Sequence, residues 1–186
     1  MGPRFVRHAA LFYGALAVAA AIWTGLRDRE FAVTKSLPVS LVLGAVTAAA
    51  TIGLGVLLYR MMPTMRQIAD ELAPTLVDGV DRTSLLMISI FSGIGEEMLF
   101  RGAMQPEFGL VVAALVFGLV HIGPDRRYLV WTAWAVVAGF LFGFLYELSG
   151  GLLAPVIAHA THNSATFLLW KRSRKPAEDR HKVDEL

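Results

Sequence analysis

Cysteine is absent from the 186-residue chain, and charged residues are few. The lack of cysteine excludes a disulfide scaffold, a cysteine-ligated zinc site and a cysteine nucleophile. Only 17% of the residues are charged and 55% are hydrophobic, whereas ordinary soluble domains have about a quarter charged residues. The basic residues are scattered outside the apolar runs, which argues against a nucleic-acid partner. The composition therefore predicts an integral membrane protein.

Six apolar segments approach or reach the length of about 20 residues that a helix needs to cross a bilayer. They are Ala9–Leu26, Leu37–Tyr59, Ser84–Gln105, Gly109–Ile122, Tyr128–Leu148 and Gly151–Trp170. The first has features of a signal peptide, but its length and the lack of a polar stretch after a cleavage site favour a retained span. The expected fold class is all-α, a polytopic membrane protein with about six transmembrane helices.

The chain divides into three expected regions. Residues 1–83 hold two N-terminal spans and an amphipathic segment, residues 84–170 hold a core of four helices, and residues 171–186 form a charged tail that we expect to be disordered. In the segment 60–83, apolar residues recur at steps of three and four, which predicts a helix lying in the membrane interface. The alternative is a soluble linker.

Basic residues predict the orientation in the membrane. With six spans, most Lys and Arg residues of the loops and termini fall on one side, in the N-terminus, the loops 60–83 and 123–127 and the tail. Both termini are therefore expected in the cytoplasm.

Ionisable residues lie inside the apolar segments, where each carries a substantial energetic cost and calls for a reason. They are Glu96, Glu97, Arg101, His121, His159 and His162, and Asn163 follows the last of them. Glu97 and Arg101 are four residues apart, which predicts a helical ion pair. Glu96 is rotated by about 100° from Glu97 on a helix, so its carboxylate is expected to stay free.

Four of these polar residues are predicted to lie at a common depth. If the third and fourth segments form a hairpin that turns near Phe108–Gly109, Glu96 precedes the turn by twelve residues and His121 follows it by twelve. The last segment starts from the same side and carries His159 and Asn163. At about 1.5 Å per residue, all four lie about 12–18 Å below that face of the membrane.

A carboxylate, two imidazoles and an amide at one depth suit the activation of water. A shielded carboxylate can act as a general base with a neighbouring histidine, and a second histidine and an amide can donate hydrogen bonds to an oxyanion. Phe117 shares a helical face with His121 and is expected to stack on its ring. The set Glu96, His121 and His159 could alternatively bind catalytic zinc. The role of His162 stays open.

Three motifs resemble those of the CPBP family of intramembrane proteases (CAAX protease and bacteriocin-processing). They are EExxxR at residues 96–101, FxxxH at residues 117–121 and HxxxN at residues 159–163. All three are complete and in order, and the resemblance extends from about Ser84 to Trp170. It implies an α-helical membrane endopeptidase of the glutamic type, with a zinc-dependent version of the same protease as the alternative.

The resemblance also implies roles for the motif residues. Glu96 would activate water together with His121, while His159 and Asn163 would form the oxyanion hole. Glu97 and Arg101 would support the site.

Substrate and location follow from the same resemblance as expectations. The substrate would be a membrane-anchored or lipidated peptide cleaved near its C-terminal part, as in the myxosortase-like group. The enzyme would lie in the inner membrane of a prokaryote, with the lipid bilayer as its surroundings and no required cofactor.

Two other function classes are compatible with buried polar residues. A non-enzymatic immunity or scaffold protein could use the polar layer to bind a partner. A proton-coupled transporter could use glutamate and histidine as a relay, although the sequence shows no inverted repeat of the kind found in many transporters.

Overall fold

The computed structural model describes residues 2–174, and every regular element in that range is helical. The elements are α1 (Gly2–Leu26), α2 (Leu37–Met61), α3 (Pro63–Val77), α4 (Arg82–Glu97), the π-helical segment η1 (Met98–Met104), α5 (Gln105–Leu119), the 3₁₀ turn η2 (Arg126–Tyr128), α6 (Leu129–Ser149) and α7 (Leu153–Ser173). The all-α fold class is thereby confirmed.

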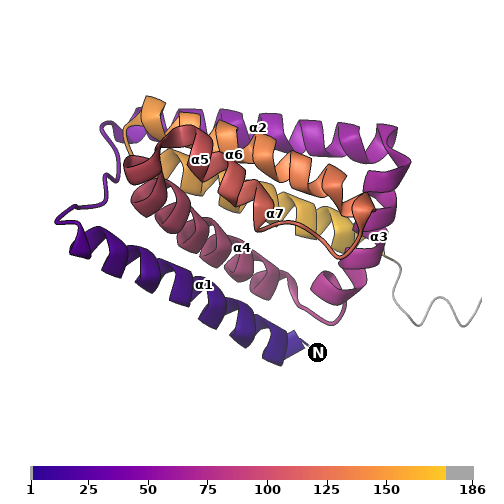
Figure 1. Ribbon diagram of the computed structural model, residues 1–186. Coiled ribbons are helices and arrows are strands. Elements are labelled where there is room, and N and C mark those ends of the chain that lie inside the picture. Colours follow the sequence, from indigo (N-terminus) through magenta and orange to yellow (C-terminus); the bar gives the residue numbers. More distant parts are fainter. Residues whose placement is uncertain (1, 175–186) are drawn as a thin grey trace, which may run out of the picture.

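Helix α7 lies at the centre of the bundle (Figure 1). It packs against α2 on one side and α4 on the other, and α1 covers the far side of α4. Helices α5 and α6 pack on each other, and α6 also contacts α7. The helices that carry the polar residues predicted to act together, α4, α5 and α7, therefore share one core.

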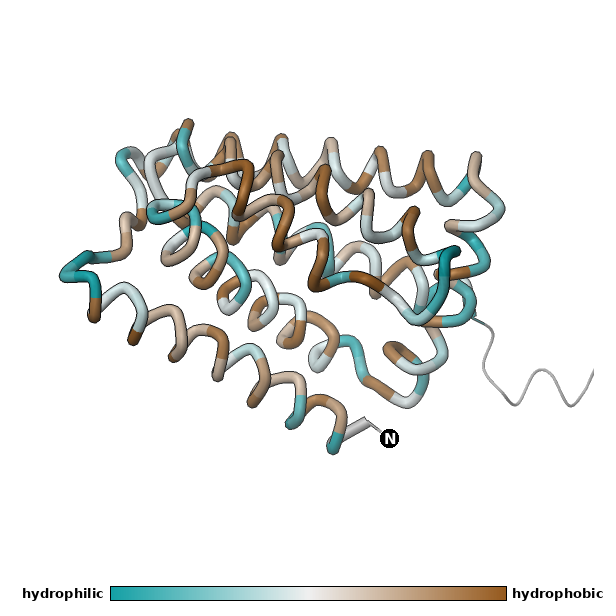
Figure 2. The backbone as a smooth tube through the Cα atoms, viewed as in Figure 1, coloured by the Kyte–Doolittle hydropathy of each residue, from teal (hydrophilic) through white to brown (hydrophobic). Residues whose placement is uncertain are grey.

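The helices present apolar side chains to their surroundings, as expected for a protein in lipid. Large exposed hydrophobic residues occur on α1, α2, α5 and α6, for example Phe12, Val46, Val111 and Phe144. Hydrophilic residues gather in the connections at the two ends of the bundle (Figure 2). Such an apolar surface is unfavourable in water but suits the hydrocarbon core of a bilayer.

Four stretches of the described chain are long and apolar enough to span a membrane, against the six segments predicted. They are Arg4–Leu26, Leu37–Met61, Arg82–Leu119 and Arg126–Ser149. The third stretch unites the third and fourth predicted segments. Helix α7 does not reach the same hydropathy, since it carries His159, His162 and Asn163.

The third stretch is bent at Gly109, close to the predicted turn. Gly109 has φ 82° and ψ 166° inside α5, a conformation that glycine adopts readily because it has no Cβ. Beyond this residue the chain returns beside η1 and packs on α6. The hairpin thus brings the end of α5 back alongside the polar end of α4.

The amphipathic segment 60–83 contains helix α3, whose buried face includes Met65, Ile68 and Ala73. This helix packs on α2, α6 and α7 at one end of the bundle. Its apolar face is therefore covered by protein. Arg127 pairs with Glu71 of α3. The loops 60–83 and 123–127 are therefore at the same end, as the prediction of sidedness requires.

The opposite end is closed by the connection between α1 and α2. Leu152 and Leu153 donate backbone hydrogen bonds to the carbonyls of Ala32 and Val33. Since the first N–H groups of a helix have no partner within it, this connection caps α7 and sets where it begins. At its other end α7 continues to Ser173, so the first residues of the predicted tail are helical, while residues 175–186 lie outside the described range.

Candidate active site

Glu97 is the buried centre of a polar cluster. One of its oxygens, Oε1, accepts hydrogen bonds from Arg101 Nη1 at 3.0 Å and from His159 Nδ1 at 2.7 Å. All three side chains are almost fully buried. The predicted pair of Glu97 with Arg101 is present. The bond to His159 was not predicted, and it connects α4 to α7 directly.

Arg101 is held in place by more than its carboxylate partner. Its Nη2 donates to the carbonyl of Gly139 at 3.0 Å, and its guanidinium carbon lies 4.4 Å from the centre of the Phe117 ring. A buried cation needs such compensation, because an unpaired charge in a low-dielectric interior is very costly. Arg101 thus ties α6 and α5 to the site.

Glu97 is the last residue of α4, and the π-helical segment η1 follows it at once. A π-helix has i→i+5 hydrogen bonds, and single π turns are frequent at functional sites. The regular helix predicted over Ser84–Gln105 is therefore wrong in its second half. The wider turn changes the rotation of every residue after Glu97 relative to a straight α-helix.

Glu96 points to a different neighbour from Glu97. Its Oε2 lies 3.9 Å from His121 Nε2, and this oxygen is buried with no hydrogen-bond partner in the described part of the chain. Glu97 Oε2 also lacks a partner, but the other oxygen of Glu97 is engaged twice. Glu96 is thus the carboxylate left free, as the helical rotation predicts.

The position of the proton on His121 follows from its second contact. His121 Nδ1 lies 2.7 Å from the carbonyl oxygen of Phe117, and a carbonyl can only accept. Nδ1 therefore carries hydrogen, and in the neutral ring Nε2 presents a lone pair toward Glu96. The Phe117 and His121 rings lie 4.8 Å apart and are tilted by 43°, so the predicted stacking is present.

His159 occupies the other side of Phe117. The centres of these two rings lie 6.0 Å apart, edge to face, and the imidazole stacks on Phe142 at 5.1 Å. Its orientation is set by Glu97 through Nδ1, which leaves Nε2 for any further partner. His121 and His159 thus both contact one phenyl ring, from helices α5 and α7.

Asn163 has a partner that sequence reasoning missed. Its Nδ2 donates to Ser92 Oγ at 2.9 Å, and Ser92 in turn donates to the carbonyl of Ser89. Ser92 is four residues before Glu96 on α4, hence on the same helical face. That spacing is the signal that could have identified it.

The alternative zinc set Glu96, His121 and His159 does not converge. Glu96 and His121 approach each other, while the bond from His159 Nδ1 to Glu97 leaves His159 Nε2 free and so does not decide the question. Among the described residues, no group of three or more histidine and acidic side chains is arranged to hold a metal ion. The residues therefore do not fit a three-ligand metal site in this arrangement.

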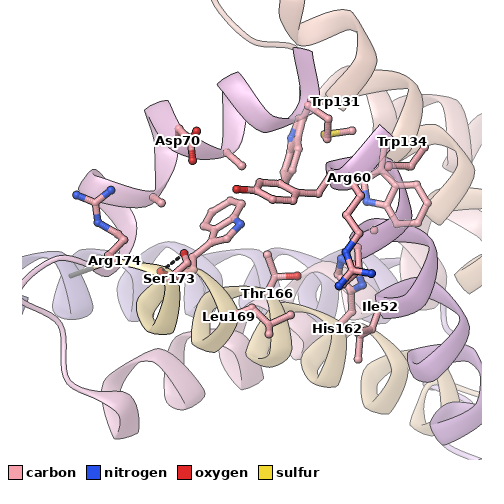
Figure 3. Close-up of a pocket in the computed structure, with 18 residues that line it drawn as sticks. Ile52, Arg60, Asp70, Trp131, Trp134, His162, Thr166, Leu169, Ser173 and Arg174 are labelled. Atoms are coloured by element: carbon pink, nitrogen blue, oxygen red, sulfur yellow. Dashed lines mark hydrogen bonds between the residues drawn. The ribbon is translucent and has the colours of Figure 1, made fainter. Parts of the chain in front are cut away.

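His162 is not part of this cluster. It lines a cavity of about 300 Å³ between α2, α3, α6 and α7, together with Tyr59, Trp131 and Trp134 (Figure 3). The Trp134 and His162 ring centres are 5.9 Å apart. Nothing in the sequence pattern indicated this cavity, because its lining comes from four helices that are distant along the chain.

Known proteins resemble the part of the chain that carries the motifs. Residues 81–165 match the family described as "Type II CAAX prenyl endopeptidase Rce1-like". Two curated proteins of Bacillus subtilis (strain 168) are similar. "Uncharacterized protein YpbD" is 32% identical over 99 residues, which are 52% of each chain. "Putative membrane peptidase YdiL" is 28% identical over 109 residues, 53% of this chain and 43% of the relative.

The chain spans about half the length of these relatives, and no solved structure matches it. The matched segment begins at the N-terminus of α4 and ends within α7. It includes all three motifs and each residue of the cluster around Glu97. The resemblance predicted from the motifs is confirmed at this level: residues 81–165 are similar to the Rce1-like family of CAAX prenyl endopeptidases.

Proposed function

We propose that this protein is an intramembrane endopeptidase in which Glu96 and His121 activate a water molecule. The observation that carries the proposal is the free oxygen of Glu96, buried 3.9 Å from the Nε2 lone pair of His121. A gap of that length is too long for a direct hydrogen bond and is suited to a water that contacts both groups. The Rce1-like match of residues 81–165 and the similarity to a protein named as a membrane peptidase support it.

The chemical step needs one proton acceptor and one pair of hydrogen-bond donors. The carboxylate of Glu96 takes a proton from water as the water oxygen bonds to the carbonyl carbon of the substrate. The carbonyl oxygen becomes an oxyanion. When this intermediate collapses, the C–N bond breaks, and the departing amine receives that proton from Glu96, either directly or by way of Nε2 of His121.

His159 and Asn163 are the proposed donors to the oxyanion. Since His159 Nδ1 is bonded to Glu97, only Nε2 can donate, and it carries hydrogen beside an Nδ1–H only in the imidazolium form. Glu97 is thus proposed to orient His159, and Arg101 balances the charge of the Glu97 carboxylate.

The substrate is proposed to be a membrane-anchored or lipidated peptide, cleaved near its membrane-embedded C-terminal part. The supporting feature is the depth of the site, within helices whose outer surfaces are apolar. The basic loops and α3 lie at one end of the bundle. We propose that this end is cytoplasmic, in a prokaryotic inner membrane.

Hydrolysis is tested by following the oxygen atom from water. Membranes from the host are incubated with the purified full chain in water enriched in ¹⁸O, and new peptide C-termini that carry the label are sequenced by mass spectrometry. The wild-type chain should generate labelled termini that Glu96→Gln does not. Glu147→Gln is the matched control and should behave as wild type, because it removes a carboxylate near the C-terminal end of α6, outside the proposed site.

Identical labelled termini from the wild type and Glu96→Gln would contradict the proposal. If a folded Glu96→Gln chain restored the phenotype of a strain that lacks this protein as fully as the wild-type chain does, the non-enzymatic immunity or scaffold function would be favoured instead.

A further inference from the structure

The cavity that contains His162 is separate from the cluster around Glu97. His162 and Asn163 are neighbours on α7, but Asn163 is bonded to Ser92 of α4 whereas His162 lies against Gly55 of α2. The cavity is therefore on a face of α7 next to that of the proposed catalytic residues, since His162 is rotated by about 60° from His159 and by about 100° from Asn163. None of Glu96, Glu97, His121, His159 and Asn163 lines it. Nothing in the proposed peptidase chemistry uses it.

The walls of this cavity are aromatic. Tyr59, Trp131, Trp134 and Trp170 contribute rings from the ends of α2, α6 and α7. Tyrosine and tryptophan are enriched where a membrane protein passes through the headgroup region, because their rings are apolar and their tips polar. The cavity is thus at the level of lipid headgroups, at the end of the bundle that carries α3.

Unpaired charges of both signs border the cavity. Figure 3 shows Asp70 of α3 and Arg60 of α2 on different sides of the cavity, and both residues line it. Among the ion pairs of residues 2–174, neither Arg60 nor Asp70 takes part. Arg174 also lines the cavity, but it is bonded to Asp78 through two contacts of 2.6 Å.

A third unsatisfied group lies at the floor of the cavity. His162 Nδ1 is buried with no hydrogen-bond partner in the described part of the chain. Buried polar atoms in native proteins nearly always have a partner. This nitrogen is covered by protein, so a ligand in the cavity contacts the His162 ring rather than Nδ1.

We propose that this cavity binds the headgroup of a zwitterionic aminophospholipid. The primary ammonium lies beside Asp70 among the aromatic rings, the phosphate pairs with Arg60, and an ester oxygen contacts His162. An ammonium beside a carboxylate gains charge-assisted hydrogen bonds and is attracted to aromatic faces. A volume of about 300 Å³ is at the small end of the range for ligand sites, enough for the headgroup and the first carbons.

The remaining acyl chain has a route along the protein surface. Leu169 lines the cavity, and its side chain is 48% exposed. Leu57 on α2 is exposed to the same extent. Since Leu169 both lines the cavity and is exposed on the apolar surface of the bundle, the ligand need not be enclosed.

Tryptophan fluorescence of the full chain in lipid nanodiscs tests the proposal. Three of the four tryptophans line the cavity, and Trp23→Phe removes the fourth. Brominated phosphatidylethanolamine, phosphatidylcholine or phosphatidylglycerol is titrated into unlabelled phosphatidylcholine, and quenching is followed. The ethanolamine lipid should give saturable quenching at a mole fraction about tenfold lower than the other two.

Variants test whether Arg60 and Asp70 cause the preference for the ethanolamine lipid. Arg60→Gln and Asp70→Asn should each remove the tenfold preference, while Arg60→Lys retains most of it. Arg172→Gln and Asp28→Asn are matched controls, because both residues are exposed and neither lines the cavity, and both should behave as wild type. Glu96→Gln should also bind the lipid normally, which separates this proposal from the proposed peptidase activity.

Three results would overturn the proposal. Equal quenching by the three lipids would leave no selective headgroup site. Equal half-saturation by phosphatidylglycerol would reduce the site to an anion site that Asp70 does not influence. Displacement of the lipid by low concentrations of soluble glycerophosphoethanolamine would identify a water-soluble ligand rather than a membrane lipid, whereas absence of displacement supports the lipid.

Discussion

His159 Nδ1 lies 2.7 Å from Oε1 of Glu97, the same oxygen that accepts a hydrogen bond from Arg101. The two consecutive glutamates consequently have different surroundings. Glu97 is the carboxylate that the fold requires, and Glu96 is the carboxylate that the fold leaves unpaired. Replacement of Glu96 should therefore lower turnover without lowering stability, whereas replacement of Glu97 should lower stability.

Glu96→Gln is expected to abolish most hydrolysis and leave stability unchanged. General-base catalysis contributes about 10²–10⁴-fold, and the Glu96 oxygen that faces His121 has no partner to lose. Turnover is measured with a substrate identified by ¹⁸O labelling, and stability by thermal unfolding in detergent. A marked loss of stability in this variant would assign Glu96 a structural role.

Glu97→Gln is expected to destabilise the protein by about 3–5 kcal/mol, because it leaves the buried Arg101 without its counter-charge. Thermal unfolding of the same detergent preparation measures the change. Glu147→Gln serves as the control for loss of one carboxylate. Wild-type stability in Glu97→Gln would show that Gly139 and the aromatic rings suffice to hold Arg101.

Asn163→Ala is expected to lower kcat by about 10²–10³, the usual cost of removing an oxyanion donor. Ser92→Ala should lower it less, because it removes only the group that orients Asn163. Kinetics of both variants on one peptide measure the difference. Equal rates for Asn163→Ala and the wild type would remove Asn163 from the oxyanion hole.

His121→Ala and His159→Ala should each lower kcat by orders of magnitude, through different steps. Loss of His121 removes the partner of Glu96 in activating water. Loss of His159 removes an oxyanion donor and a buried partner of Glu97. Only His159→Ala should therefore also reduce thermal stability, and a loss of stability limited to His121→Ala would contradict this assignment.

Chelation distinguishes the glutamate mechanism from its zinc-dependent version. Since no three histidine or acidic side chains of the described residues are arranged to hold a metal ion, activity is expected to survive prolonged treatment with a chelator. The measurement is peptide cleavage before and after treatment, with zinc added back. Activity that is lost on chelation and restored by zinc would establish the metal-dependent version.

The start of α4 should be sensitive to acid. Hydrogen bonds from the hydroxyl and the backbone N–H of Ser84 lower the pKa of Asp81 below its ordinary value. Its stabilising contribution is thus complete above the unfolded-state pKa and is lost as the pH falls through the lower, folded-state pKa. Amide hydrogen exchange at the first turn of α4 should accelerate in that range, and Ser84→Ala should shift the acceleration to higher pH.

Local spacing in the sequence was sufficient to predict part of the site. The pair Glu97 and Arg101, the stack of Phe117 on His121 and the turn near Gly109 all depend on residues within about one helical turn or on one glycine. Counting residues from that turn also placed Glu96 and His121 at the same depth, where they are found 3.9 Å apart.

Two other features, the π-helical segment and the cavity around His162, could not be predicted from the sequence pattern. The π-helical segment after Glu97 is not marked by any residue type in Met98–Met104. Its packing depends on a distant residue: a Cβ on Gly102 would lie 2.5 Å from the Phe31 ring. The cavity around His162 likewise depends on contacts among four helices.

The sequence by itself determined which segments are helical and apolar, and which polar groups they carry into the membrane, because helix periodicity and hydropathy are properties of neighbouring residues. The tertiary structure decided which partner each polar group receives. Gly93 allows α4 to approach α7 so closely that a Cβ there would lie 3.0 Å from Ala160, and this contact sets the rotation of α7. With that rotation His159 meets Glu97, Asn163 meets Ser92, and His162 turns toward the aromatic cavity.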